Sequence, residues 1–153
     1  MKRILFFISF FLLSFYSCED SLKNHPIPSY GVYLDLDLMT PRDKDLRTAP
    51  SYTIYTAKNL NLGERIGFGD IIVVKTMNNE YKAFDLACPH EAKRNVLVEV
   101  DELNAVCPVC GSKFEISLTG TGMCIEGESK YPLRPYQVIQ HSSNRLTVRN
   151  QNR

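Results

Sequence analysis

Two short runs of cysteine and histidine constrain the fold of this chain more than any other feature of its sequence. Cys88-Pro89-His90 is a C-x-H pair, and Cys107-Pro108-Val109-Cys110, which begins seventeen residues after His90, is a C-x-x-C pair. Each run lies between segments with strand character, so each is expected to form a loop. Two loops that each provide two ligands can close a four-ligand metal site. The fold must therefore bring these two loops together.

The chain after residue 30 predicts β structure. Residues 32–38 alternate between apolar and polar side chains, which is typical of a strand with one buried face. Turn signals such as Asn78-Asn79 separate further strand-like runs at 52–56, 70–76, 80–86, 95–100, 105–107, 113–117, 136–141 and 145–149. A loop is expected at 40–50. No stretch of twelve or more residues after Ser17 keeps a helical period, so we predict a small all-β domain, an antiparallel sandwich or barrel.

Length and composition narrow the possible functions. The chain has 153 residues, a formal net charge of +1 and 44% hydrophobic residues, which indicates one packed domain without a strong electric field. That balance argues against nucleic acid as a partner. The length leaves little room for a separate catalytic domain, so we expect the chain not to be an enzyme by itself.

The first seventeen residues have the pattern of an export signal. Lys2 and Arg3 precede an apolar run, 4–15, which is too short to span a bilayer. Cys18 follows Ser17, and the segment resembles a bacterial lipoprotein signal in which that cysteine carries the lipid. Phe15-Tyr16 departs from the usual residues before the cysteine, so simple cleavage is the alternative. The resemblance implies a lipid-anchored protein of the bacterial cell envelope, on the periplasmic or outer-membrane side.

Residues 18–29 are polar, contain two prolines and show no helical or strand period. They are expected to form a tether between the lipid and a domain at 30–150. His25 lies in this tether and is expected to be solvated.

The two ligand runs resemble those of the Rieske iron–sulfur domain family. That family has C-x-H and then C-x-x-H-G-[ST], and Cys107 to Ser112 matches the second motif except at Cys110. Flanking segments are also similar, so that the resemblance covers about residues 48–150. It implies a Rieske-like fold with an inserted cluster-binding subdomain, whose loops are at about 86–92 and 107–114. It also implies a 2Fe-2S cluster.

Cys110 stands where the family has its second histidine. Mapped onto the family, Cys88 and Cys107 hold one iron, while His90 and Cys110 hold the other. A thiolate favours the oxidised state more than an imidazole does, so the expected reduction potential lies between the Rieske range and that of all-cysteine clusters. The family resemblance places three further residues around the cluster: Gly111, Ser112 and Phe114. Ser112 matches a hydroxyl that raises the potential, and Phe114 stands where many high-potential members have tyrosine.

The resemblance implies one-electron transfer between a redox donor and a redox acceptor protein, with His90 as the exit point. The sequence leaves other occupants open. Three cysteines and one histidine also suit zinc, and Cys107 and Cys110 can pair as a disulfide in an oxidising compartment. With zinc, a disulfide or a vacant site, the chain would instead be a non-redox interaction or structural module.

Four other features carry weaker expectations. Cys124 is expected to be a buried structural cysteine. The segment 127–131 replaces the family's proline-containing cover over the cluster. His141 is expected at the surface, and Asp35 and Asp37 are expected on a solvated strand face.

Overall fold

The computed structural model describes residues 24–151. Within them the chain is built from strands and a single short 3-10 helix, η1 (Lys44–Arg47), which lies in the expected loop. None of the described helices is long and apolar enough to cross a membrane. The strands are β1 (Tyr33–Asp37), β2 (Ser51–Tyr55), β3 (Ile71–Lys75), β4 (Tyr81–Asp85), β5 (Glu99–Asp101), β6 (Asn104–Val106), β7 (Lys113–Glu115), β8 (Cys124–Glu126), β9 (Pro135–Gln140) and β10 (Arg145–Arg149).

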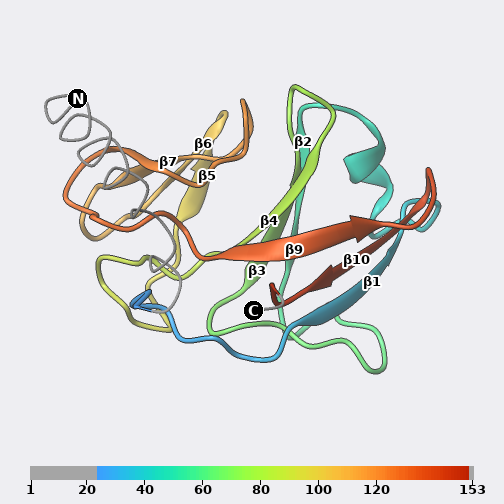
Figure 1. Cartoon of the computed structure of the whole chain (residues 1–153), viewed down its shortest axis with the longest axis horizontal. Helices are drawn as coiled ribbons and strands as arrows, with labels where there is room; N and C mark the ends of the chain where they lie inside the picture. Colours follow the sequence, from blue (N-terminus) through green and yellow to red (C-terminus); the bar gives the residue numbers. More distant parts are fainter. Residues whose placement is uncertain (1–23, 152–153) are drawn as a thin grey trace, which may run out of the picture.

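The strands form two antiparallel sheets, which confirms the predicted all-β class (Figure 1). The larger sheet has the order β1-β10-β9-β4-β3-β2, and the smaller has the order β5-β6-β7-β8. All four strands of the smaller sheet come from the chain between β4 and β9, which are neighbours in the larger sheet. The smaller sheet is therefore an inserted subdomain, as the family resemblance implied.

The larger sheet curls around its own core. Leu34 and Leu36 of β1 lie in the same buried cluster as Tyr55 of β2, although β1 and β2 are at opposite edges of the sheet. The alternation at residues 32–38 is confirmed, because all four of its apolar side chains are at most 5% exposed. Burial of this face stabilises the sheet through the hydrophobic effect.

β3 connects the two cores of the molecule. Ile71 and Val73 face the core of the curled sheet, whereas Ile72 and Val74 face a second core shared with the inserted subdomain. All four side chains are fully buried. A strand covered on both faces has no need of polar residues on alternate positions, which explains its continuous apolar run.

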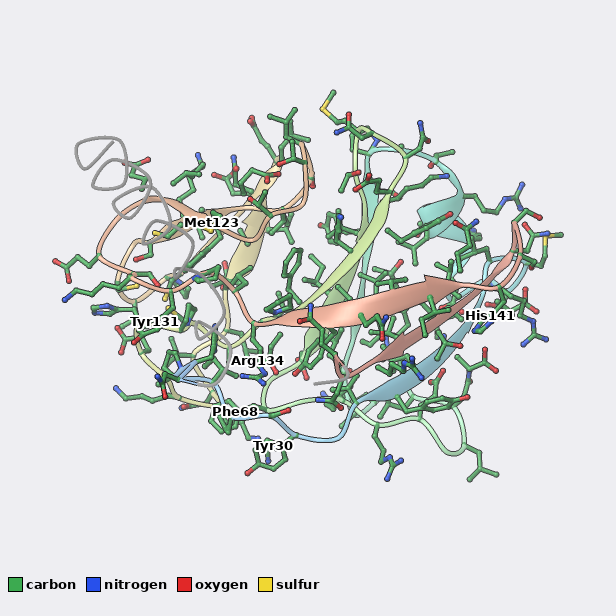
Figure 2. All side chains as sticks on the ribbon, in the orientation of Figure 1. Tyr30, Phe68, Met123, Tyr131, Arg134 and His141 are labelled. Atoms are coloured by element: carbon green, nitrogen blue, oxygen red, sulfur yellow. The ribbon has the colours of Figure 1, made fainter. Side chains whose placement is uncertain are left out.

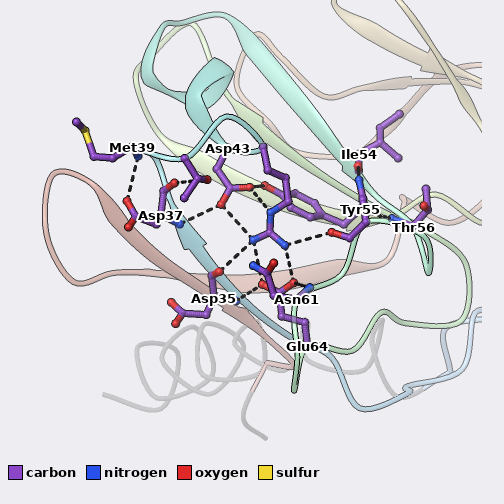
Figure 3. A network of polar contacts seen from close by, with 12 residues as sticks. Asp35, Asp37, Met39, Asp43, Ile54, Tyr55, Thr56, Asn61 and Glu64 are labelled. Atoms are coloured by element: carbon purple, nitrogen blue, oxygen red, sulfur yellow. Dashed lines mark hydrogen bonds and ion pairs between the residues drawn. The ribbon is translucent and has the colours of Figure 1, made fainter.

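A buried ionic network holds the loop at residues 40–50 against β1 and β2 (Figure 3). Arg42 donates two hydrogen bonds to Glu64, of 2.6 and 3.0 Å, and two to Asp43, of 2.8 and 3.1 Å. Burial acts to raise the pKa of Glu64, but the hydrogen bonds from Arg42 and two backbone amides outweigh it and lower the pKa. Tyr55 donates its hydroxyl to Asp43 at 2.9 Å.

The N-terminal part of the described chain corrects one expectation. His25 is 8% exposed and Ile27 is fully buried, so the prediction of a solvated histidine is wrong. His25 Nε2 lies 2.9 Å from the carbonyl oxygen of Pro132, and Arg134 donates to the carbonyl oxygen of Ile27 at 2.7 Å. Their partners lie 107 residues away, so no local pattern in the sequence marks these contacts.

Two details of the smaller sheet also differ from the sequence prediction. β8 (Cys124–Glu126) was not predicted, because a strand of three residues is too short to show a clear alternating pattern in the sequence. The strand predicted at 95–100 begins only at Glu99. Residues before it belong to the return path of the first ligand loop, where Leu97 makes a single bridge to Ala87.

Candidate metal centre

The first ligand loop leaves the end of β4 and turns back through residues 92–98. The amide of Cys88 donates to the carbonyl oxygen of Val96 at 2.9 Å, and the amide of Ala92 donates to that of Cys88 at 2.9 Å. Ala92 has a φ of 51°, which completes the turn. These backbone bonds hold Cys88 at the base of the loop, fully buried.

The second ligand loop connects β6 to β7 as a tight turn. The amide of Gly111 donates to the carbonyl oxygen of Cys107 at 3.0 Å, and the amide of Cys107 donates to that of Ser112 at 2.9 Å. Gly111 has a φ of +71°, a conformation that side chains disfavour, so glycine is the favoured residue here. The turn places Cys107 and Cys110 on the same side of the loop.

The two loops bring three thiols together. The Sγ atoms of Cys88, Cys107 and Cys110 all lie within 4.8 Å of one another, and those of Cys88 and Cys110 are 3.7 Å apart. Burial raises the pKa of the Cys88 thiol. For Cys110 burial acts in the same direction, but contacts with the side chain and backbone of Ser112 outweigh it and lower the pKa. The Cys110 thiol therefore loses its proton more readily than the Cys88 thiol does.

His90 lies outside the three-thiol group. Its side chain is 37% exposed, and its Nε2 is 3.7 Å from a carboxylate oxygen of Glu128. Glu128 is a neighbour of His90 that the sequence prediction missed, because nothing in the local sequence around residue 128 marks it. The structure thus brings together three of the four expected ligands, and ligation by His90 stays a prediction.

Ser112 joins the second ligand loop to the segment that covers it. Its Oγ accepts hydrogen bonds of 3.1 Å from the amides of Glu128 and Ser129, and lies 3.3 Å from Cys110 Sγ. With its oxygen occupied by two amides, the hydroxyl hydrogen is free to be donated to a thiolate at Cys110. Gly127 packs so closely that a Cβ there would lie 2.6 Å from Ser112 Cα. The segment 127–131 therefore forms a cover over this side of the site.

Comparison with known proteins identifies the domain. A model of the Rieske [2Fe-2S] domain matches residues 51–137. The chain belongs to the Rieske [2Fe-2S] domain family. A comparison with curated proteins returned no match.

Solved structures agree on the fold. The chain is similar to the apo form of the quaternary ammonium Rieske monooxygenase CntA, with a TM-score of 0.53, 12% identity, and coverage of 89% of this chain and 43% of that one. The complex of CntA with gamma-butyrobetaine gives a TM-score of 0.52, 13% identity, and coverage of 89% and 43%. At this identity the similarity concerns the fold alone, and this chain spans less than half the length of CntA.

The other expected site residues occupy defined places in the Rieske domain. Phe114 is fully buried in the core shared with the inserted subdomain and pairs across β7–β8 with Cys124. Cys124 is partly buried, and its Sγ lies 3.2 Å from the carbonyl oxygen of Glu126. Among the described residues Cys124 does not join the three-thiol group. Cys18 lies outside the described residues.

The donor set of the site suits two kinds of metal centre. Cysteine thiolates are the usual ligands of iron–sulfur clusters, and the convergence of three thiols at two Rieske loops fits such a cluster. The spacing also suits one tetrahedral ion, because two thiolates at about 2.3 Å from one zinc ion are about 3.8 Å apart. The 3.7 Å between Cys88 and Cys110 matches that value, although the family mapping assigns them to different irons.

Proposed function

We propose that this protein transfers single electrons through a 2Fe-2S cluster at the bacterial cell envelope, anchored by a lipid on Cys18. The observation that carries the proposal is the convergence of Cys88, Cys107 and Cys110 at the two ligand loops of a Rieske domain. Such a cluster supplies one-electron oxidation and reduction. Its redox donor and acceptor would be separate proteins.

Each residue of the site has a distinct part in this proposal. Cys88 and Cys107 are buried and would hold the inner side of the cluster. Cys110 and the exposed His90 would complete the ligand set on the side nearer solvent, where an electron reaches a partner over the shortest path. In this structure the Cys110 thiol donates to Ser112 Oγ at 3.3 Å. Once Cys110 binds the metal as a thiolate, the Ser112 hydroxyl would donate to that sulfur instead and so reduce its charge.

The test is a metal analysis of protein purified without oxygen from its native host. We expect iron and sulfide in equal amounts, two of each per chain, and an EPR signal after reduction. Cys107→Ala removes a buried thiol of the site and is expected to abolish the signal. Cys124→Ser is the matched control, because Cys124 lies outside the three-thiol group, and it should retain the signal. Zinc alone, or no metal, would overturn the proposal.

The thiol spacing favours a second candidate, a structural module tied by zinc. In that case the metal would join the two loops, and the function would reside in binding to another envelope protein. Cys88→Ala separates the candidates. Electron transfer predicts a coloured wild type that loses its colour and redox activity on this substitution, whereas a zinc module predicts a colourless wild type that loses its one zinc ion per chain.

A further inference from the structure

The first described residues form a strap along one end of the domain. We call residues 24–30 the strap. His25 accepts a hydrogen bond from the amide of Ile27 at 3.1 Å, which leaves its Nε2 to donate to the carbonyl oxygen of Pro132 at 2.9 Å. Ile27 is fully buried. The strap is thus fixed to the domain by both burial and hydrogen bonds.

Both ends of the strap contact the part of the molecule that carries the two ligand loops and the cover. We call this part the metal-binding end. His25 packs edge-on against Tyr131, the last residue of the cover over Ser112. At the other end, the ring of Tyr30 lies under the guanidinium of Arg94, 5.3 Å away, in the first ligand loop. Tyr30 also lies beside Phe68, with ring centroids 5.9 Å apart. The strap therefore braces the cover and the first ligand loop at once.

The metal-binding end lies at one end of the long axis of the domain. Tyr131 and Met123 lie at one end of that axis, and His141 lies at the other (Figure 2). Because His25 contacts Tyr131, the chain enters the domain at the metal-binding end. Only six residues, 19–24, separate Cys18 from His25. Six extended residues span at most about 20 Å, so a lipid on Cys18 would hold this end near the bilayer.

The metal-binding end also exposes aliphatic side chains. Val109, between Cys107 and Cys110, is 61% exposed. Met123 and Ile125, beside and within the edge strand β8, are 54% and 57% exposed. Other described parts of the surface expose aliphatic side chains as well, such as Met39 at 64% and Leu62 at 107%, so these three residues agree with a membrane-facing end but do not decide it.

We propose that the metal-binding end faces the bilayer and that the strap sets this orientation. The inference rests on the lipid anchor of the proposed function. Its consequence is that the electron partner is a membrane-bound protein whose redox centre lies close to the bilayer surface, and not a soluble carrier. The exposed Val109 and His90 then lie on the surface that meets this partner.

Energy transfer from tryptophan to a dansyl-labelled lipid measures which end lies nearer the membrane. The chain contains no tryptophan, so a single one reports from a single place. Met123→Trp and His141→Trp are a matched pair, because both residues are exposed and lie at opposite ends of the long axis. Each variant is prepared as the full chain with its lipid and placed in vesicles. We expect transfer severalfold more efficient from position 123 than from position 141.

A second pair of variants tests the strap. His25→Ala and Tyr30→Ala combined with Ile27→Ala remove both ring contacts and the buried side chain that fixes the strap, which lengthens the free chain, so the difference between positions 123 and 141 should shrink. Circular dichroism verifies that the domain remains folded. Equal or reversed transfer in lipidated protein overturns the orientation alone. Mass spectrometry that finds no lipid on Cys18 overturns the anchor and the orientation together. The energy-transfer measurement does not depend on the metal content of the protein. Its outcome is therefore independent of the test of electron transfer.

Discussion

The thiol at position 110 is the residue that most distinguishes this site. Its Sγ is 3.7 Å from that of Cys88 and 3.3 Å from the hydroxyl of Ser112. The site therefore gathers three sulfur atoms, each carrying a negative charge when it binds a metal. In the proposed cluster this charge stabilises the oxidised state and lowers the reduction potential.

Replacement of that thiol by an imidazole should raise the potential. We expect Cys110→His to shift the midpoint potential upward by on the order of 100 mV, since two-histidine Rieske centres lie well above all-cysteine clusters. Protein-film voltammetry measures the shift. Cys124→Ser, a cysteine outside the three-thiol group, should leave the potential unchanged. A potential that falls in Cys110→His would contradict the assignment of Cys110 as a ligand.

His25 should make the stability of the domain depend on pH. Burial is the main cause that lowers its pKa, and the charge of Arg134 acts in the same direction, while hydrogen bonds to Pro132 and Ile27 and the charge of Asp85 oppose them. The folded state thus binds the proton less readily than the unfolded chain. The contribution of His25 is complete above the unfolded pKa of about 6.5 and is lost as the pH falls below it.

Urea denaturation at pH 7 and pH 5 measures this effect. The free energy of unfolding should fall over that interval more in the wild type than in His25→Gln, which cannot take up the proton. His141→Gln is the control, because it makes the same replacement at an exposed histidine outside the strap. An identical pH dependence in wild type and His25→Gln would show that the strap does not respond to protonation.

At the scale of elements, the ionic network around Arg42 decides how the loop at 40–50 docks on the sheet. Asp43 and Glu64 have side chains only 1% and 2% exposed, and both depend on the single guanidinium between them. Removal of one partner leaves buried charges without compensation. We expect Arg42→Ala to lower the free energy of unfolding by about 3 kcal/mol.

Arg145 provides the matched comparison for that prediction. It pairs with Asp35 at 3.5 Å and Asp37 at 3.8 Å, but its side chain is 55% exposed. Solvent screens such a pair, so Arg145→Ala should cost less than about 1 kcal/mol. Urea denaturation of both variants checks the ranking. Equal losses would mean that burial does not decide the strength of these pairs.

At the scale of the whole molecule, the metal site belongs to the smaller of two structural units. Cys88 and Cys107 lie in the core shared by the larger sheet and the inserted subdomain, whose strands have three residues each. Strands this short contribute few hydrogen bonds of their own. The larger sheet has a separate core within its curl. Metal binding is therefore expected to stabilise the inserted subdomain more than the larger sheet.

Hydrogen exchange before and after chelation tests this expectation. Amides of β6, β7 and the two ligand loops should exchange at least about tenfold faster without metal, because local opening no longer breaks metal bonds. Amides of β9 and β10 serve as the internal control and should change little. Uniform acceleration across both sheets would mean that the two units unfold together.

The sequence by itself determined most of the secondary structure and the identity of the ligand loops. The alternation at 32–38 and the apolar run of β3 are local patterns, and the two ligand runs are recognisable from their spacing. The tertiary structure decided which side chains meet. It brought Cys88 to Cys110, left the His90 ring beside Glu128, and buried His25 against residues 107 positions away. Contacts between distant segments depend on how the whole chain packs, so no local pattern encodes them.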